Sequence, residues 1–442
     1  MQDIDQTAAS PRPSRGNASP LQQMLGPLTR TGGFYARTWG TYLDRQPGEL
    51  PVARPTLALA AQAFRDEIVL AGFGMLRPTP TTTTLEQTDR EVLAALQMYR
   101  QHGWLDRPEA FFAAPPPLAD VTVKRVHSMG RTYQRISFDS EYQPHPGEPG
   151  RERWLSYPGN RRVYGLMLQH RRPRPWLICV HGAEMGRAAL DLMLFHAWHL
   201  YSDLGLNVVL PVLPLHGPRA RGRPKGAAFP SENVLDAVHG AAQAVWDLRH
   251  LLSWIRSQQA GPMIGLNGIS LGGLLSALVA SLDDGLTCAI LGVPAVDVVD
   301  LIGRHAGISG HRRLRQTMNT AKPIGRMISP LALTPRTPQS GRFIYAGVAD
   351  RLVHPRDQVA RLWEHWGKPE IHWYQGGHTG FFGSQPVQRF VDAALVQSGL
   401  VDPAAATSPT LTQPLAQNRE VTLGRRRVQP ALHHLTHPRV DV

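Results

Sequence analysis

Short apolar runs alternate with stretches of helical periodicity along most of the chain. Short apolar runs bounded by turn residues are typical of strands, and apolar residues that recur every three or four positions are typical of amphipathic helices. We predict strands at residues 121–126, 132–138, 163–169, 176–180, 207–213, 263–267, 287–293, 342–347 and 370–374, and helices at residues 188–201, 231–257 and 386–398. Ser231 is the predicted N-cap of the second of these helices. Buried strands that alternate with helices predict an α/β protein with a mostly parallel central sheet and helices on both faces.

The chain before residue 119 has a different pattern. Residues 21–118 are predicted to form an N-terminal helical extension, with helices at 56–70 and 85–102, and the α/β domain is predicted at 119–400. The two ends of the chain, residues 1–20 and 401–442, are polar and rich in proline, so we predict a disordered N-terminus and a flexible C-terminal tail. We expect the extension to pack against the α/β domain. The sequence also allows three other roles for it: covering a functional site, mediating dimerisation or docking on lipid.

The charge of the chain is strongly positive but dispersed. The formal net charge is +13, and only four of the 47 basic residues are lysine. No zinc-ligand spacing or aromatic RNA-binding signature accompanies the arginines, so we expect no nucleic-acid partner. The best candidate for a membrane span, residues 57–75, contains Arg65, Asp66 and Glu67, so no transmembrane segment is expected. The N-terminus lacks the apolar core of a secretory signal, so we expect a cytoplasmic protein. The sequence predicts no particular oligomeric state.

One motif combines a strand, a tight turn and a helix. Residues 268–272 read Gly-Ile-Ser-Leu-Gly and stand between the predicted strand at 263–267 and an apolar stretch at 274–282. A serine between two glycines at such a junction is typical of a nucleophile elbow, in which the flanking glycines relieve crowding in the turn. The helix N-terminus then directs N–H groups toward the serine oxygen. The motif predicts Ser270 as a nucleophile, with a structural turn serine as the alternative.

Together with three further motifs, this pattern resembles the α/β-hydrolase superfamily over roughly residues 121–399, nearest to its dienelactone-hydrolase-like and prolyl-oligopeptidase-like branches. Residues 179–182 (Cys-Val-His-Gly) and 211–217 (Pro-Val-Leu-Pro-Leu-His-Gly) follow predicted strands, and Ser-Pro-Leu precedes the strand at 342–347. The resemblance implies the α/β-hydrolase fold, a triad in the order nucleophile, acid and histidine, and no cofactor or metal. It also implies an oxyanion hole formed by two backbone N–H groups and a pocket beside it, with these candidates: Leu271 and Ala183 for the hole, and His181, Gly182 and His216 for the pocket.

The resemblance also implies the other two members of the triad. The pattern G-x-x-D-x-x-V follows the strand at 342–347 and makes Asp350 the acid, and a glycine-rich turn after the strand at 370–374 makes His378 the base. An imidazole titrates near neutral pH and can accept the serine proton, while the carboxylate orients the ring and stabilises the imidazolium. The alternatives that the chain offers are Asp297, Asp300 and Asp357 for the acid, and His354, His365 and His372 for the base.

A basic segment lies where this family often inserts a cap. Residues 301–349 contain eight basic residues and no acid, and we predict a small basic cap at 301–340. The segment is either a solvated helical insertion or a lid that steers an anionic substrate, with residues 219–225 adding to the same field.

We expect a serine hydrolase that cleaves a carboxylic ester through an acyl-enzyme intermediate. The substrate would be a small-molecule or lipid ester, and it would be anionic if the basic cap faces it. The sequence also allows peripheral contact of the protein with a membrane. One alternative is an acyltransferase in which a hydroxyl acceptor replaces water at the same triad. A second is a non-catalytic binding protein on a hydrolase fold, which the intact Ser270, Asp350 and His378 disfavour.

Overall fold

The computed structural model describes residues 20–44, 50–76, 80–128, 130–223, 228–308 and 311–403. The predictions made for residues 1–19 and 404–442 lie outside these ranges. At the C-terminal boundary the prediction is corrected, because Val401 is buried in the core and its N–H donates to the carbonyl of Leu395. The folded body therefore continues past residue 400, where the tail was predicted to begin.

Within the described ranges the strands form one nine-stranded sheet, in the order β1-β2-β3-β5-β4-β6-β7-β8-β9. The first three strands and the β3–β5 pair are antiparallel, and the remaining neighbours are parallel. All nine predicted strands are present, with ends that move by a residue or two: β1 Thr122–Ser128, β2 Arg131–Asp139, β3 Arg162–Leu168, β4 Trp176–Val180, β5 Asn207–Pro211, β6 Ile264–Ile269, β7 Cys288–Gly292, β8 Arg342–Gly347 and β9 Glu370–Tyr374. The mostly parallel α/β architecture is confirmed.

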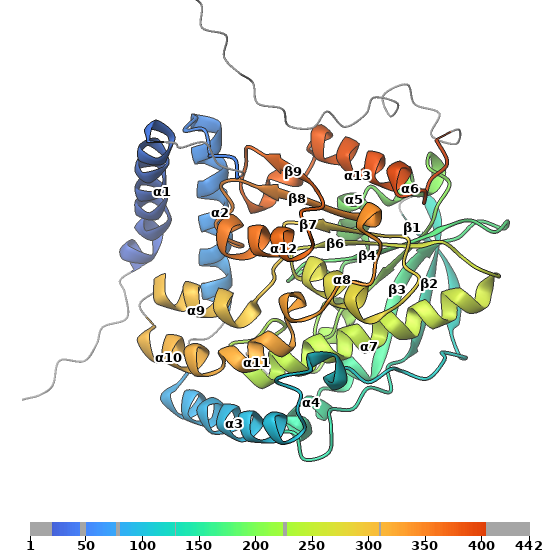
Figure 1. Cartoon of the computed structure of the whole chain (residues 1–442), viewed down its shortest axis with the longest axis horizontal. Helices are drawn as coiled ribbons and strands as arrows, with labels where there is room; N and C mark the ends of the chain where they lie inside the picture. Colours follow the sequence, from blue (N-terminus) through green and yellow to red (C-terminus); the bar gives the residue numbers. More distant parts are fainter. Residues whose placement is uncertain are drawn as a thin grey trace, which may run out of the picture.

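Helices cover both faces of this sheet. Figure 1 shows α6 and α13 on one face and α7 on the other. Helix α8 is buried along its whole length because it packs between the sheet and α7. The helices of the α/β region are α4 Arg151–Leu155, α5 Ala188–Leu194, α6 Ala197–Ser202, α7 Val234–Gln258, α8 Leu271–Leu282, α9 Val298–Ile308, α10 Arg312–Thr320, α11 Lys322–Met327, α12 Ala360–His365 and α13 Gln385–Gln397.

Two local predictions about helices are wrong. The single helix predicted at 188–201 is divided into α5 and α6 at His196, whose φ of 49° lies in the left-handed region. The N-cap of α7 is Asn233, whose side chain accepts from the N–H groups of Leu235 and Asp236. The predicted cap, Ser231, instead accepts from the N–H of Asn233. An asparagine oxygen caps a helix as well as a serine does, so the sequence allowed either residue.

The N-terminal extension forms helices α1 Pro20–Leu43, α2 Leu57–Leu76 and α3 Thr82–Gln101. Helix α1 packs on α2, which contacts the short 3₁₀ segment His378–Phe381, whereas α3 packs on α7, α10 and α11. Figure 1 shows α1 and α2 side by side at the end of the sheet formed by β8 and β9. No helix within the described ranges has both the length and the apolarity that a membrane span requires.

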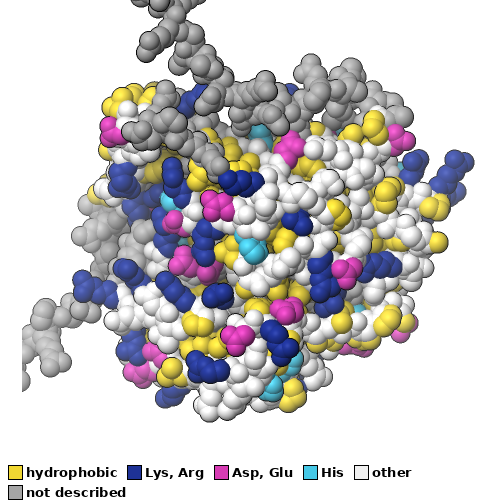
Figure 2. All heavy atoms as spheres, in the orientation of Figure 1, with side chains coloured by type: hydrophobic (Ala, Val, Ile, Leu, Met, Phe, Trp, Pro, Cys, Tyr) yellow, Lys and Arg dark blue, Asp and Glu magenta, His cyan; other side chains and the backbone are white. Residues whose placement is uncertain are grey.

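Much of the positive charge that was considered for substrate steering has local partners. Arg219 is buried, forms an ion pair with Asp247 and donates to two backbone carbonyls, so its assignment to a steering field is wrong. In the predicted cap, Arg313 pairs with Asp89 of α3 at 2.8 Å. Figure 2 shows Lys and Arg side chains spread over the visible face among acidic ones rather than gathered in one stripe.

Candidate active site

The turn between β6 and α8 holds Ser270 in a strained conformation. Its φ and ψ are 57° and −113°, a region that costs a non-glycine residue about 1–3 kcal/mol. The flanking glycines permit this turn: a β-carbon at Gly272 would lie 1.9 Å from the carbonyl oxygen of Val180, and one at Gly268 would lie 2.2 Å from the carbonyl oxygen of Gly272. The residue types at 268 and 272 therefore follow from close packing of β6, α8 and the end of β4.

Ser270, His378 and Asp350 lie in one hydrogen-bonded row. His378 Nε2 is 3.1 Å from Ser270 Oγ, and His378 Nδ1 is 2.7 Å from Asp350 Oδ2. The other carboxylate oxygen, Asp350 Oδ1, accepts from the N–H groups of Leu352 at 2.9 Å and Val353 at 2.7 Å. These two bonds fix the carboxylate, so that its free oxygen faces the imidazole.

The arrangement also determines how His378 can exchange protons. Because the Asp350 oxygen can only accept while it is ionised, Nδ1 carries the ring proton and Nε2 presents its lone pair to the serine hydroxyl. Burial opposes a charged ring, but the charge and hydrogen bond of Asp350, together with the charge of Asp66, outweigh it and raise the pKa of His378. The ring is therefore a stronger base than a free imidazole.

The alternative acids have other partners. Asp297 Oδ1 accepts from the N–H of Asp300 at the start of α9, at 2.9 Å. Asp357 forms an ion pair with Arg304, and it also contacts the ring of His354. Neither carboxylate is hydrogen-bonded to His378, which has Asp350 in that place.

The alternative bases are likewise occupied. His354 Nδ1 is 3.1 Å from Asp357, and His365 Nε2 is 2.8 Å from the carbonyl oxygen of Leu333. His372 stacks on Phe390, with ring centroids 5.5 Å apart. Among the described residues, His378 is the histidine within hydrogen-bonding distance of Ser270.

The two predicted oxyanion-hole residues, Leu271 and Ala183, directly follow Ser270 and Gly182 in the chain. Leu271 is the first residue of α8, and the loop after β4 approaches so closely that a β-carbon on Gly182 would lie 3.4 Å from Ser270 Cβ. In the described part of the chain, no hydrogen bond occupies the N–H of Leu271 or of Ala183. Both N–H groups are therefore without an acceptor among the described residues.

His181 and His216 have structural contacts at the end of this loop. Both rings are buried, with centroids 5.1 Å apart. His181 Nδ1 donates to the carbonyl of Gly182 at 2.8 Å, and Nε2 accepts from the N–H of Leu213 at 3.1 Å. Burial, and then the charge of His216, lower the pKa of His181 to about 3, so the ring is neutral. The ring ties the loops after β4 and β5 together, and its one proton is donated to the carbonyl of Gly182.

Sequence reasoning missed a carboxylate that the extension brings to this site. Asp66 of α2 is fully buried, and its Oδ2 accepts from the backbone N–H groups of His378 at 2.6 Å and Arg351 at 3.1 Å. Oδ1 lies 3.4 Å from both the N–H and the hydroxyl of Thr379. Burial, and then the charge of Asp350, raise the pKa of Asp66 to about 6. One carboxylate from the extension thus joins the loops that carry Asp350 and His378.

Neighbouring residues of α2 strengthen this junction. Gln62 Oε1 accepts from the N–H of Gly377 at 3.0 Å, and the buried Glu67 pairs with Arg351 at 3.0 Å and with Arg30 of α1 at 2.6 Å. The signal in the sequence was the acidic pair at 66–67 inside an apolar helix, because carboxylates on a buried face need partners. The sequence could not say which partners they meet.

The mixed sheet, its strand order and the strained Ser270 between β6 and α8 define an α/β-hydrolase fold, so the fold that the resemblance to that superfamily implied is confirmed. No family model matches the chain. The chain belongs to the same family as two proteins of Mycobacterium tuberculosis, "Uncharacterized protein MT2702" of strain CDC 1551 / Oshkosh and "Uncharacterized protein Rv2627c" of strain ATCC 25618 / H37Rv. Each is 62% identical over 382 residues, which cover 86% of this chain and 92% of the relative.

Solved structures with a similar fold include two acetyl xylan esterases. The enzyme from Thermoanaerobacterium sp. JW/SL YS485 is 14% identical, with a TM-score of 0.44 over 68% of this chain and 93% of that one. The enzyme from Paenibacillus sp. R4 is 16% identical, with a TM-score of 0.43 over 73% of this chain and 99% of that one. Both are likenesses of fold, and neither identifies a substrate of this chain.

Proposed function

We propose that the protein is a serine hydrolase that cleaves a carboxylic ester through an acyl-enzyme. The observation that supports this most directly is the row Ser270 Oγ, His378 and Asp350, joined at 3.1 Å and 2.7 Å. A serine hydroxyl is a weak nucleophile near neutral pH until a base removes its proton. The strained turn that presents Ser270 is a further reason, because strain of this kind concentrates at functional sites.

In this proposal the reaction has two halves. Ser270 Oγ attacks the ester carbonyl while His378 Nε2 takes the hydroxyl proton and then donates it to the leaving alcohol. Water deprotonated by His378 attacks the acyl-enzyme, and Ser270 regains its proton as the acid product leaves. Asp350 keeps the ring proton on Nδ1 and stabilises the imidazolium in both halves. An ester is the proposed class because an alcohol leaves more readily than an amine.

The developing oxyanion would be held by the N–H groups of Leu271 and Ala183. The closeness of Gly182, which precedes Ala183, to Ser270 and the lack of acceptors for both N–H groups among the described residues support this role. One such donor is typically worth about 2.7–4 kcal/mol in the transition state. His181 would support the hole indirectly, because it fixes the loop that carries Ala183.

We assign Asp66 as a positioning residue for His378. Its contacts are to the backbone of residues 378 and 351, so it would act on the ring through the loop that holds it. Its charge also contributes to the raised pKa of His378. The extension would thereby be part of the catalytic machinery rather than an independent attachment.

Labelling with a fluorophosphonate, which reacts with an activated serine, tests the nucleophile. Wild type is expected to take the label, and Ser270→Ala is expected to lose it. Ser281→Ala is the matched control, since Ser281 lies on the same helix and donates to the carbonyl of Ala277. Label that persists on Ser270→Ala would move the nucleophile elsewhere.

A substrate panel then tests the reaction class. Wild type should hydrolyse p-nitrophenyl esters of some chain length faster than the matching p-nitroanilides, and Ser270→Ala should hydrolyse neither above background. Faster cleavage of the anilides would contradict the ester assignment. Transfer of the acyl group to an added alcohol in preference to water would favour an acyltransferase.

A further inference from the structure

A second site lies between the N-terminal extension and the loop that carries the triad acid. A cavity of about 670 Å³ is bounded by α1, the segment at residues 51–53, Arg304 of α9 and residues of the loop 348–356. This volume is in the range of small-molecule pockets, which is about 300–1,000 Å³. Ser270 and His378 do not line it, so the cavity is separate from the proposed ester site.

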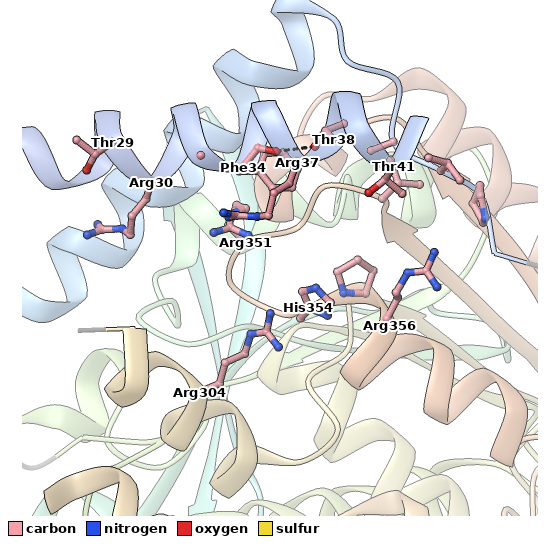
Figure 3. A pocket seen from close by; sticks show the side chains of 16 residues that line it. Thr29, Arg30, Phe34, Arg37, Thr38, Thr41, Arg304, Arg351, His354 and Arg356 are labelled. Atoms are coloured by element: carbon pink, nitrogen blue, oxygen red, sulfur yellow. Dashed lines mark hydrogen bonds between the residues drawn. The ribbon is translucent and has the colours of Figure 1, made fainter. Parts of the chain in front are cut away.

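The lining of this cavity is strongly cationic. It includes Arg30, Arg37, Arg304, Arg351, Arg356 and His354, and none of the described residues that line it is an aspartate or glutamate. Figure 3 shows Arg30 and Arg37 on α1 at one side, and Arg304 and Arg356 on the opposite side. Guanidinium groups from elements far apart in the sequence therefore meet around one space.

Only part of this charge is neutralised by the protein. Glu67 pairs with Arg30 and Arg351, and Asp357 pairs with Arg304. Among the described residues around the cavity, two carboxylates against five arginines leave an excess of three positive charges (5 − 2 = 3). Burial, and then the charge of Arg304, lower the pKa of His354, which keeps that ring neutral.

Arg37 and Arg356 carry two of these three charges, and the third remains on Arg30 and Arg351, which share the carboxylate of Glu67. Among the described residues, neither has a carboxylate partner, and both side chains are exposed to solvent at the cavity. Arginines gathered without counter-charge repel one another, and an anionic ligand relieves that repulsion. Their planar forks match phosphate and carboxylate oxygens in pairs.

We propose that this cavity binds a small molecule that carries a diphosphate group, with Arg37 and Arg356 as its main contacts. The charge count selects this class, because a phosphate group carries roughly −1.5 to −2 charges and a single carboxylate carries one. Two linked phosphates therefore balance the excess of three that the described lining residues and their partners leave. The inference goes beyond the proposed hydrolase activity and does not depend on it.

Such a ligand would contact the loop of the triad acid. Arg351 lines the cavity, follows Asp350 in the chain and donates its backbone N–H to Asp66. The Arg351 guanidinium also lies over the ring of Phe34 on α1, 4.8 Å from its centroid. A ligand held by these arginines would therefore tie α1 to the loop 348–356.

Isothermal titration calorimetry with inorganic pyrophosphate tests the site on the full chain. Wild type and Ser270→Ala should bind one pyrophosphate with equal affinity. The double variant Arg37→Ala/Arg356→Ala should bind pyrophosphate more weakly, by about tenfold for each arginine removed. This factor is what the loss of one charge-assisted hydrogen bond of ordinary strength costs in affinity. Arg125→Ala/Arg135→Ala removes the same charge from exposed positions on β1 and β2 and should bind as wild type does.

Three results would overturn the proposal: no measurable binding of pyrophosphate, equal weakening in both double variants, or citrate binding as tightly as pyrophosphate. A sedimentation assay with phosphatidylcholine vesicles containing phosphatidic acid separates a soluble ligand from a lipid headgroup. Vesicles that retain wild type but not Arg37→Ala/Arg356→Ala, with no binding of pyrophosphate, would also overturn it. The circular dichroism spectrum of each variant distinguishes lost binding from lost folding.

Discussion

Replacing Asp66 with asparagine separates the charge of this residue from its hydrogen bonds. The pKa of Asp66 is raised from 3.8 to about 6, chiefly because the carboxylate is buried. One pKa unit corresponds to about 1.4 kcal/mol, so the ionised group is disfavoured by about 3 kcal/mol relative to the neutral one. The native state therefore binds this proton more tightly than the unfolded state does. The resulting stability is present below pH 3.8 and is lost as the pH rises through about 6.

The asparagine variant should escape this loss. Its amide oxygen can still accept from the N–H groups of His378 and Arg351, and it stays neutral at every pH. At pH 8 we expect Asp66→Asn to be more stable than wild type by up to about 3 kcal/mol. Near pH 4, where Asp66 is largely protonated, the difference should shrink toward zero.

Activity should change in a different way. With the charge of Asp66 removed, the pKa of His378 should fall, and the acid limb of kcat/KM should move to lower pH, because the neutral ring is the base. Asp66→Ala should instead leave two buried N–H groups without an acceptor, at about 1–3 kcal/mol each at both pH values. It should also lower kcat by up to about 100-fold, since the histidine loop loses its support.

Urea denaturation at pH 8 and pH 4, and p-nitrophenyl ester kinetics from pH 5 to 9, measure these effects. Asp120→Asn, a charge loss at an exposed position, is the control and should match wild type in both assays. If Asp66→Asn were destabilised at pH 8 as much as Asp66→Ala, the ionised carboxylate would be stabilising, and the reasoning from burial would be refuted. An unchanged acid limb would remove the electrostatic link to His378.

The other predictions concern the turn and its support. Asp350→Asn should lower kcat by about 10⁴-fold in ester hydrolysis, because the ring would favour the wrong tautomer; a loss below tenfold would count against Asp350 as the acid. Gly272→Ala should not fold to a thermally stable protein, since its β-carbon would lie 1.9 Å from the carbonyl oxygen of Val180; a wild-type melting curve by circular dichroism would contradict this. His181→Ala should lose about 1–3 kcal/mol in urea denaturation, because the Leu213 N–H loses its acceptor, and unchanged stability would contradict that role.

The fold was predictable because its signals are local. Each strand is a short apolar run, and the alternation of such runs with helices predicts a mostly parallel sheet. The turn at Ser270 was predictable for the same reason, because two glycines and a serine specify a geometry within five residues. The elements that were misplaced, at His196 and at Ser231, depended on which of several near-equivalent local conformations the packing selected.

Asp66 and Arg219 could not be assigned from the sequence, because their roles depend on distant partners. The hydrogen bond from His378 to Asp66 spans 312 residues. Arg219 stands in a basic stretch that suggested a surface field, yet it is buried against Asp247. Sequence patterns indicate that a charge needs a partner, but only the fold determines which partner it receives.

The N-terminal helices influence two sites through one shared junction. Asp66 and Glu67 are consecutive buried residues of α2, and both contact Arg351. Glu67 pairs with the guanidinium of Arg351, and Asp66 accepts from its backbone N–H. Arg351 faces the basic cavity, while Asp66 also holds the backbone N–H of His378. Any movement of α2 would therefore change the cavity and the histidine loop together. For this reason the extension is a structural part of the folded α/β domain, and a chain without it would leave the His378 and Arg351 N–H groups without their acceptor.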